Sequence, residues 1–128
     1  MFTLLDAADP AGRRALAAAG AMGGADHFEV AMTCANLAAL HADRGHFGTA
    51  EALGRRALRI LDTIAGAGGA EAGLTLLNLA TAIAGRGRRA EAVTAAARAE
   101  AILADRFPAG HPHIQAARDA LCRLRVRS

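Results

Sequence analysis

The sequence predicts an all-α fold, a solenoid of about six helices arranged as antiparallel hairpins in a single domain. The first observation is self-similarity: Asn36–Ala38 recurs at Asn78–Ala80, and Gly12–Leu16 recurs at Gly54–Leu58, both with an offset of 42 residues. The second is that apolar residues recur every three or four positions, which is the spacing of one helix face. The third is that turns containing glycine separate these apolar segments. Together they indicate stacked helical repeats, which bury a continuous core by packing on their neighbours.

Residues 1–26 are expected to form an N-terminal half repeat. The pattern predicts one helix that begins at about Ala7 or Pro10 and ends at Ala19, since proline is tolerated in a first helical turn. Three of the next five residues are glycine, which commonly follows the end of a helix. The segment therefore corresponds to the second helix of a hairpin.

Residues 27–68 are predicted to be the first full repeat. A helix over residues 27–40 precedes a turn in which Gly45 can adopt the left-handed conformation that ends many helices. A second helix is predicted over residues 48–65, followed by a glycine-rich connector. The predicted buried positions are Val30, Cys34, Leu37, Ala38 and His41, then Ala50, Leu53, Ala57, Ile60, Leu61 and Ile64.

Residues 69–110 are predicted to be the second repeat. Gly87 takes the turn position of Gly45, and the second helix should end before Phe107, because a residue that precedes proline avoids the helical region. The predicted buried positions are Ala72, Leu76, Leu79, Ala80 and Ile83, then Ala92, Ala95, Ala96, Ala99, Ile102 and Leu103.

Residues 111–128 are expected to form a C-terminal capping helix. Leu121 falls at the position of Leu37 and Leu79, so this helix has an apolar face. The opposite face is basic, and a terminal helix with one apolar and one polar face keeps the end of a solenoid soluble. The basic residues are Arg118, Arg123, Arg125 and Arg127.

These residues resemble the tetratricopeptide repeat, which is a scaffold of helix hairpins. The resemblance lies in Asn36–Ala38, Gly45, Phe47, Ala50 and Ala57–Ile60. The 42-residue spacing and the pair His111-Pro112 are similar to the longer variety found in kinesin light chains and in many bacterial signalling proteins. The resemblance covers nearly all of the chain. It implies a right-handed superhelix whose function is protein binding.

Some positions depart from the family pattern. Arg89 stands where the first repeat has the aromatic Phe47, and Ala120 stands where the asparagine belongs. Gly54 and Ala96 replace a large apolar residue. We expect these changes to loosen the packing and to make the last helix a cap.

The resemblance also implies the binding site. In that family the first helices line a concave groove, and an asparagine at the place of Asn36 and Asn78 often holds the backbone of a bound peptide. An alternative interpretation is that each amide bonds a neighbouring helix and only stabilises the solenoid. The other groove positions implied by the resemblance are Met32, Ala35, Ala39, Asp43, Leu74, Leu77, Thr81, Asp119 and Arg123. This lining is apolar with sparse charge, which favours a peptide with apolar anchors.

Other chemistry finds little support in the sequence. The chain has one serine, at its last position, and scattered acids, so we expect no catalytic residues and no enzyme activity. Its five histidines do not cluster with thiolates or carboxylates, so we expect no metal site and no cofactor. The two cysteines, Cys34 and Cys122, fall at apolar helix positions and are expected to be buried free thiols. We expect a cytoplasmic protein without a membrane span.

The partner is expected to be a protein or peptide. All 15 basic residues are arginine, but the net charge is only +3 and the chain has no Tyr or Trp to stack on bases, so we do not expect nucleic acid as the partner. A homodimer is the competing interpretation, because the predicted repeats begin and end with half a hairpin, which another copy can pair with. Homo-oligomerisation is therefore the second function that we consider.

Overall fold

The described part of the computed structural model comprises residues 26–65 and 69–126, which form five α-helices and no strand. The all-α prediction is confirmed for these residues, which hold five helices where about six were expected for the whole chain. The helix expected over residues 7–19 and most of the glycine-rich connector lie outside the described residues. The helices are α3 (Asp26–Asp43), α4 (Phe47–Ala65), α5 (Ala70–Gly85), α6 (Arg89–Arg106) and α7 (Pro112–Val126).

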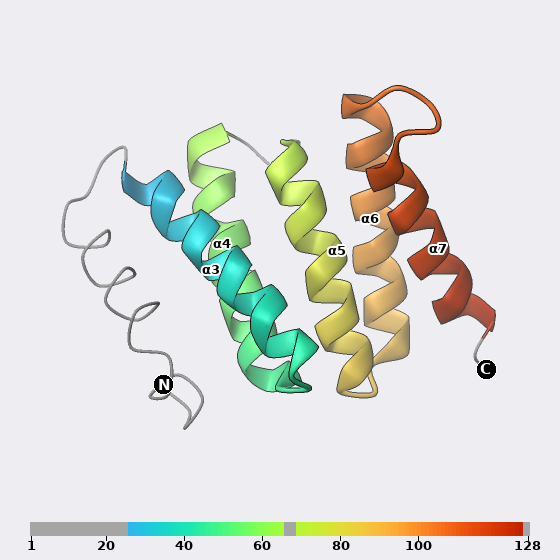
Figure 1. The fold of residues 1–128 in the computed structure, drawn as a ribbon, viewed down its shortest axis with the longest axis horizontal. Helices are drawn as coiled ribbons and strands as arrows, with labels where there is room; N and C mark the ends of the chain where they lie inside the picture. The colour runs from blue at the N-terminus through green and yellow to red at the C-terminus, as the bar shows by residue number, and fades with distance from the viewer. Residues whose placement is uncertain (1–25, 66–68, 127–128) are drawn as a thin grey trace.

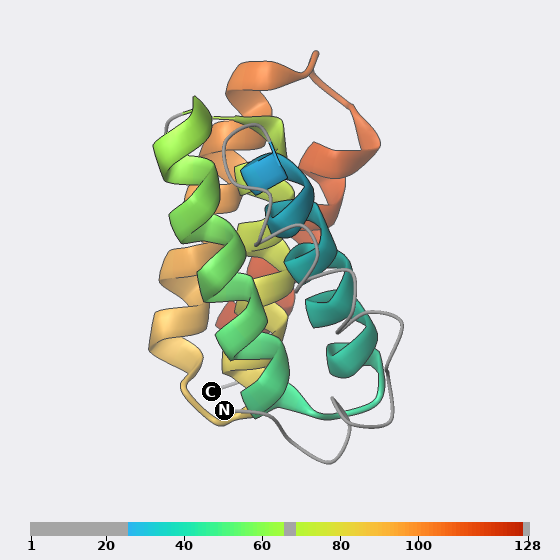
Figure 2. The ribbon, with the colours of Figure 1, turned by 90° about the vertical axis from the view of Figure 1, so that its left-hand side faces the viewer.

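The helices follow one another in a row, and each packs mainly against its neighbours in the chain (Figure 1). The pairs α3–α4 and α5–α6 are antiparallel hairpins, and α7 packs against α6. Helix α5 also contacts both α3 and α7, so the first helix of each hairpin and α7 form one layer. In the end-on view, α4 and α6 lie along the other side from α3 (Figure 2).

Both hairpin turns have the same geometry, and glycine makes it possible. Gly45 has a φ of +80°, its N–H donates to the carbonyl of Ala42 at 3.0 Å, and the N–H of His46 donates to the carbonyl of His41 at 2.8 Å. These bonds satisfy the last carbonyls of α3 in a Schellman motif. The second turn repeats the pattern around Gly87, whose φ is +83°. The predicted left-handed glycines are confirmed.

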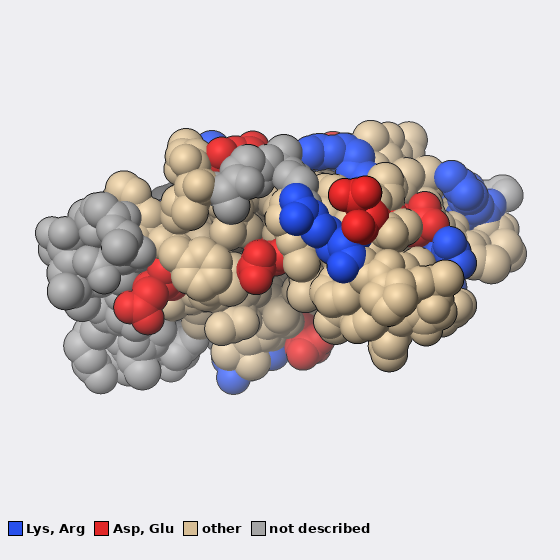
Figure 3. Space-filling view, turned by 90° about the horizontal axis from the view of Figure 1, so that it is seen from above, with Lys and Arg blue, Asp and Glu red and all other residues tan. Residues whose placement is uncertain are grey.

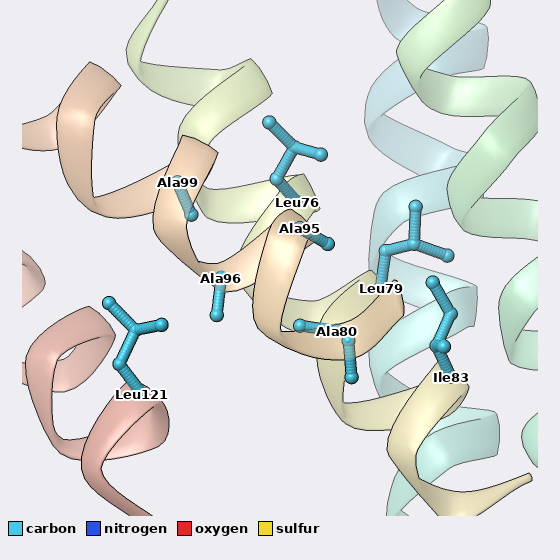
Figure 4. Close-up of a cluster of buried hydrophobic side chains, with 9 residues drawn as sticks. Leu76, Leu79, Ala80, Ile83, Ala95, Ala96, Ala99 and Leu121 are labelled. Carbon is cyan, nitrogen blue, oxygen red and sulfur yellow. The ribbon is translucent and has the colours of Figure 1, made fainter. Parts of the chain in front are cut away.

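The largest buried cluster joins α5, α6 and α7 (Figure 4). Small residues let these helices approach closely. Between α5 and α6, Gly73 allows such a close approach, since a Cβ there would lie 3.0 Å from the Leu103 side chain. The cluster consists of Leu76, Leu79, Ala80, Ile83, Ala92, Ala95, Ala96, Ala99 and Leu121.

Most of the predicted buried positions are confirmed, but four details differ. Ile64 is 44% exposed, because it lies in the last turn of α4, beyond Leu61, which is buried. The first helix, predicted over residues 27–40, extends three residues further and ends at Asp43. Leu37 and several others are half-buried and pack at the edge of clusters. Gly54 does not loosen the packing: it is buried, and a Cβ there would meet the Leu79 side chain at 3.4 Å.

Candidate functional site

Two exposed asparagine amides mark the layer of first helices. Asn36 lies in α3 and Asn78 lies in α5, at equivalent positions of the two hairpins. Both side chains are exposed, and neither forms a hydrogen bond with another described residue. Asparagine is disfavoured in helix interiors because its amide competes for backbone hydrogen bonds. Within residues 26–65 and 69–126, neither amide bonds a neighbouring helix, as the alternative interpretation requires.

The apolar residues expected on the same layer are half-buried. Met32 packs beside the buried cluster that joins α3, α4 and α5, while Leu74 and Leu77 pack beside the cluster that joins α6 and α7. Ala39 is also half-buried, and Asp43 is exposed at the end of α3. The leucines and the methionine thus contribute to packing between helices, and each exposes part of its surface to solvent.

The structure brings two of the predicted residues together in one pocket. Thr81 of α5 and Arg123 of α7 line a hollow of about 460 Å³ between these helices, and the other predicted site residues do not line it. The rest of the lining was not predicted. The signal in the sequence is the abundance of alanine, whose side chain is too small to fill the space between two helices. The remaining lining residues are Ala80, Ala84, Ala120, Cys122, Leu124 and Val126.

The arginines of α7 differ in whether they form ion pairs. Arg118 donates to a carboxylate oxygen of Glu100 at 3.0 Å, which ties α7 to α6. Arg123 and Arg125 are exposed and form no ion pair with another described residue. Arg123 lines the pocket, and Arg125 lines a different hollow on the α6 side of α7. The pocket is therefore lined by one arginine, Arg123, that has no ion-pair partner among the described residues.

A second group of arginines, by contrast, is held in an ion-pair network. Glu51 of α4 is buried and accepts hydrogen bonds from Arg55, from Arg86 at 2.9 Å and from Arg88. Arg55 also pairs with Glu91 of α6 at 2.6 Å, and Arg88 pairs with Glu91 at 3.2 Å. The network thus joins the first hairpin to the turn of the second. Each of its arginines is paired with at least one of these two carboxylates.

The protonation of Glu51 reflects this network. Burial alone raises the pKa of Glu51, but hydrogen bonds from Arg88, Arg55 and Arg86 outweigh burial and lower the pKa from 4.5 to about 2. The hydrogen bonds that Arg55 donates to Glu51 and Glu91 raise the pKa of Arg55. The carboxylate is therefore ionised throughout the neutral and mildly acidic range.

Arg89 also has a structural partner. Its guanidinium donates to the backbone carbonyls of Leu124 and Arg125, in the last turn of α7. A cation at the C-terminal end of a helix interacts favourably with the helix dipole. We expected the replacement of an aromatic residue by Arg89 to loosen the packing. The bonds from Arg89 to α7, which its counterpart Phe47 does not make, offset that effect.

The two cysteines have different environments. Cys34 is buried as expected, and burial raises the pKa of its thiol, an effect that Arg56 and Arg59 only partly offset. Cys122 is exposed, so the prediction that it is buried is wrong. The reason is its position on α7, where it borders two hollows instead of a neighbouring helix.

The histidines at the start of α7 and within α3 have structural contacts in these helices. His111 accepts a hydrogen bond on its Nδ1 from the backbone N–H of His113 at 3.0 Å, which satisfies an unpaired donor at the start of α7. Phe107 stacks on the His111 ring at a centroid distance of 4.1 Å. His41 is buried in α3, as predicted. Within residues 26–65 and 69–126, no three His, Cys, Asp or Glu side chains gather in a way that suits a metal ion.

Comparison with known proteins does not indicate a function for this chain. The chain matches no known protein family, and it matches no curated protein.

None of the helices in the described residues has the length and apolar character that a membrane span requires. Viewed from above, the described surface carries acidic and basic side chains interspersed, with no extended area of one sign (Figure 3).

Proposed function

We propose that the chain is an adaptor that binds a partner peptide along the layer formed by α3, α5 and α7. In this proposal the two hairpins are tetratricopeptide-type repeats, and they belong to a right-handed superhelix whose concave groove is that layer. The observation that carries the proposal is the pair of exposed amides, Asn36 and Asn78, at equivalent positions of neighbouring helices.

The chemistry of the amide suits a peptide backbone. A side-chain amide offers a donor and an acceptor together, as a peptide unit does. Because no described residue uses the amides of Asn36 and Asn78, both remain available to a ligand. Partly exposed apolar side chains on the same layer, such as Met32 and Leu74, add contact area for the side chains of the peptide.

Nucleic acid fits this surface less well. In the basic cluster, Arg86 and Arg88 are already paired with Glu51, and Arg88 also with Glu91, which reduces the positive charge offered to phosphates. The chain also has no Tyr or Trp, and its four Phe residues are its only aromatic residues besides histidine. Stacking on aromatic rings contributes much of the affinity for single strands.

Homo-oligomerisation remains the second candidate. The observation that favours it is Val126, which is 73% exposed at the end of α7. However, Arg123 and Arg125 flank it, and two copies that pair through the same face would bring like charges together. The peptide-binding proposal has no such electrostatic cost.

The proposal is tested by affinity capture from the lysate of the source cell. The baits are the wild type, Asn36→Ala/Asn78→Ala, and the control Thr63→Ala/Thr94→Ala, which removes exposed polar groups from the second helices. All baits must first show equal helicity. We expect a partner that the wild type and the control retain and that the asparagine variant loses. A partner that all three baits retain equally would place the binding site elsewhere.

A further inference from the structure

The pocket between α5 and α7 has the size of a ligand-binding site. Its volume of about 460 Å³ is within the range of about 300–1,000 Å³ that is typical of ligand pockets. Its α5 wall is made of small side chains, Ala80, Thr81 and Ala84, and the hydroxyl of Thr81 donates to the carbonyl of Leu77 at 3.4 Å. The pocket is therefore mainly an apolar surface.

One charged group interrupts this apolar surface. Arg123 is exposed, lines the pocket and has no ion-pair partner among the described residues. Its neighbour Arg118 is already bound to Glu100. A guanidinium beside an apolar hollow is complementary to a ligand that carries a carboxylate next to an apolar group, because arginine binds carboxylates through two parallel hydrogen bonds.

We propose that this pocket is the anchor subsite for a peptide segment in which an aliphatic side chain lies beside an acidic residue. The inference rests on the proposed peptide-binding function and specifies its ligand. The aliphatic group enters the hollow between α5 and α7, and the carboxylate pairs with Arg123. The pocket is on the same layer as Asn78, so one extended peptide can reach both.

Two other occupants fit the charge of this region less well. A second copy that docks through its own α7 would place Arg123 and Arg125 opposite the same two groups, which is repulsive. A nucleic acid would find one guanidinium in an apolar hollow instead of a row of cations with aromatic rings. Both remain as outcomes of the test.

The test measures the fluorescence anisotropy of three labelled peptides with the full chain. Their cores are alternating Glu and Leu, alternating Lys and Leu, and alternating Glu and Ser. We expect the Glu–Leu peptide to bind about tenfold more tightly than either of the others, because it alone supplies both the carboxylate and the aliphatic group.

Matched variants locate the binding. Arg123→Glu should weaken binding of the Glu–Leu peptide by about tenfold or more, whereas Arg125→Glu, the same change on the other side of α7, should change it by less than about twofold. Ala84→Leu, which fills the pocket, should also weaken binding, and Ala101→Leu on the exposed surface of α6 should not. Circular dichroism confirms that each variant is folded.

Several results would overturn the proposal. Equal losses in Arg123→Glu and Arg125→Glu would reveal only a general charge effect, and equal affinity for the Lys–Leu peptide would rule out carboxylate recognition. Self-association that Arg123→Glu abolishes would assign the pocket to a second copy, and tighter binding of a labelled oligonucleotide would assign it to nucleic acid. If Asn36→Ala/Asn78→Ala weakens peptide binding and Arg123→Glu does not, the groove function stands and the pocket assignment fails.

Discussion

The junction between α4 and α5 and the junction between α6 and α7 occupy equivalent places in the repeat, but different contacts hold them. At the first, the Phe47 ring packs so closely on Gly85 that a Cβ there would lie 2.4 Å from the ring. At the second, Arg89 takes the place of Phe47 and donates to the carbonyl of Leu124 in the last turn of α7. An aromatic ring against a glycine is thus replaced by a cation at a helix end.

The electrostatic contacts differ as well. Buried Glu51 joins α4 to the next turn through Arg86 and Arg88, whereas the equivalent position in α6 is Val93, which cannot form such a network. The second junction has instead the pair of Arg118 with Glu100, whose side chains are 57% and 29% exposed. Exposed ion pairs stabilise weakly. The repeat therefore determines which helices meet, and the residues at each junction determine how stable the contact is. We expect α7 to unfold from its neighbours before α5 does.

The largest effect should come from the leucines that close the two junctions. Leu79 is 3% exposed and packs on Gly54, while Leu121 is 6% exposed and shares its cluster with Ala96. Leu79→Ala should lower the free energy of unfolding by about 3–4 kcal/mol, and Leu121→Ala should lower it by about 2–3 kcal/mol, because α7 has packing on fewer sides. Urea unfolding measures both. A larger loss for Leu121→Ala would reverse the order of the two junctions.

The ion-pair network should make the first junction sensitive to acid. Because the pKa of Glu51 is lowered to about 2 in the folded state, its contribution to stability is complete above about pH 4.5 and is lost as the pH falls toward 2. Its arginine partners are 40–50% exposed, so screening reduces this contribution to on the order of 2 kcal/mol. Urea unfolding between pH 7 and pH 2.5 measures it.

Glu51→Gln is the matched variant for this prediction, since it keeps the shape and removes the charge. Its stability at pH 7 should be lower by a similar amount, and its stability should fall less steeply below pH 4.5 than that of the wild type. Parallel pH profiles for the two proteins would show that the network does not contribute to stability.

The contact between Phe47 and Gly85 should give a smaller but specific effect. Gly85→Ala places a Cβ against the ring, and we expect a loss of about 1–2 kcal/mol after the ring shifts. In the background of Phe47→Ala the same change should be neutral or stabilising, because alanine is a better helix former than glycine. Thermal unfolding of the four proteins in this cycle measures the coupling between the two positions. Additive effects would mean that the ring does not restrict this site.

The helices and turns were predictable because their signals are local. Periodic apolar residues and the glycines Gly45 and Gly87 specify helices and left-handed turns without any long-range information. What failed depends on distant neighbours: the exposure of Cys122 and Ile64 depends on which helix lies opposite each residue. Sequence spacing assigns a residue to a face, but it does not say whether that face is covered.

The candidate site shows the same limit. The resemblance places Thr81 and Arg123 on one layer, but only the packing of α5 against α7 brings them to the same pocket. The network around Glu51 was also not predicted, because Arg86 and Arg88 are 35 and 37 residues away from it in the chain. Pairings over such distances follow from the stacking of the hairpins and have no local pattern.

The contact of Arg89 should give the smallest effect and the most local one. Arg89→Ala removes the donor to the carbonyls at the end of α7 and should lower the free energy of unfolding by about 1 kcal/mol. Because this junction has no buried carboxylate, we expect the loss to appear as faster amide hydrogen exchange confined to α7, with α5 unaffected. Arg98→Ala, on the exposed surface of the same helix, is the control and should change neither. Exchange that accelerates equally in α5 and α7 would mean that the two junctions unfold as one unit, and the difference between them would then have no consequence for the dynamics of the chain.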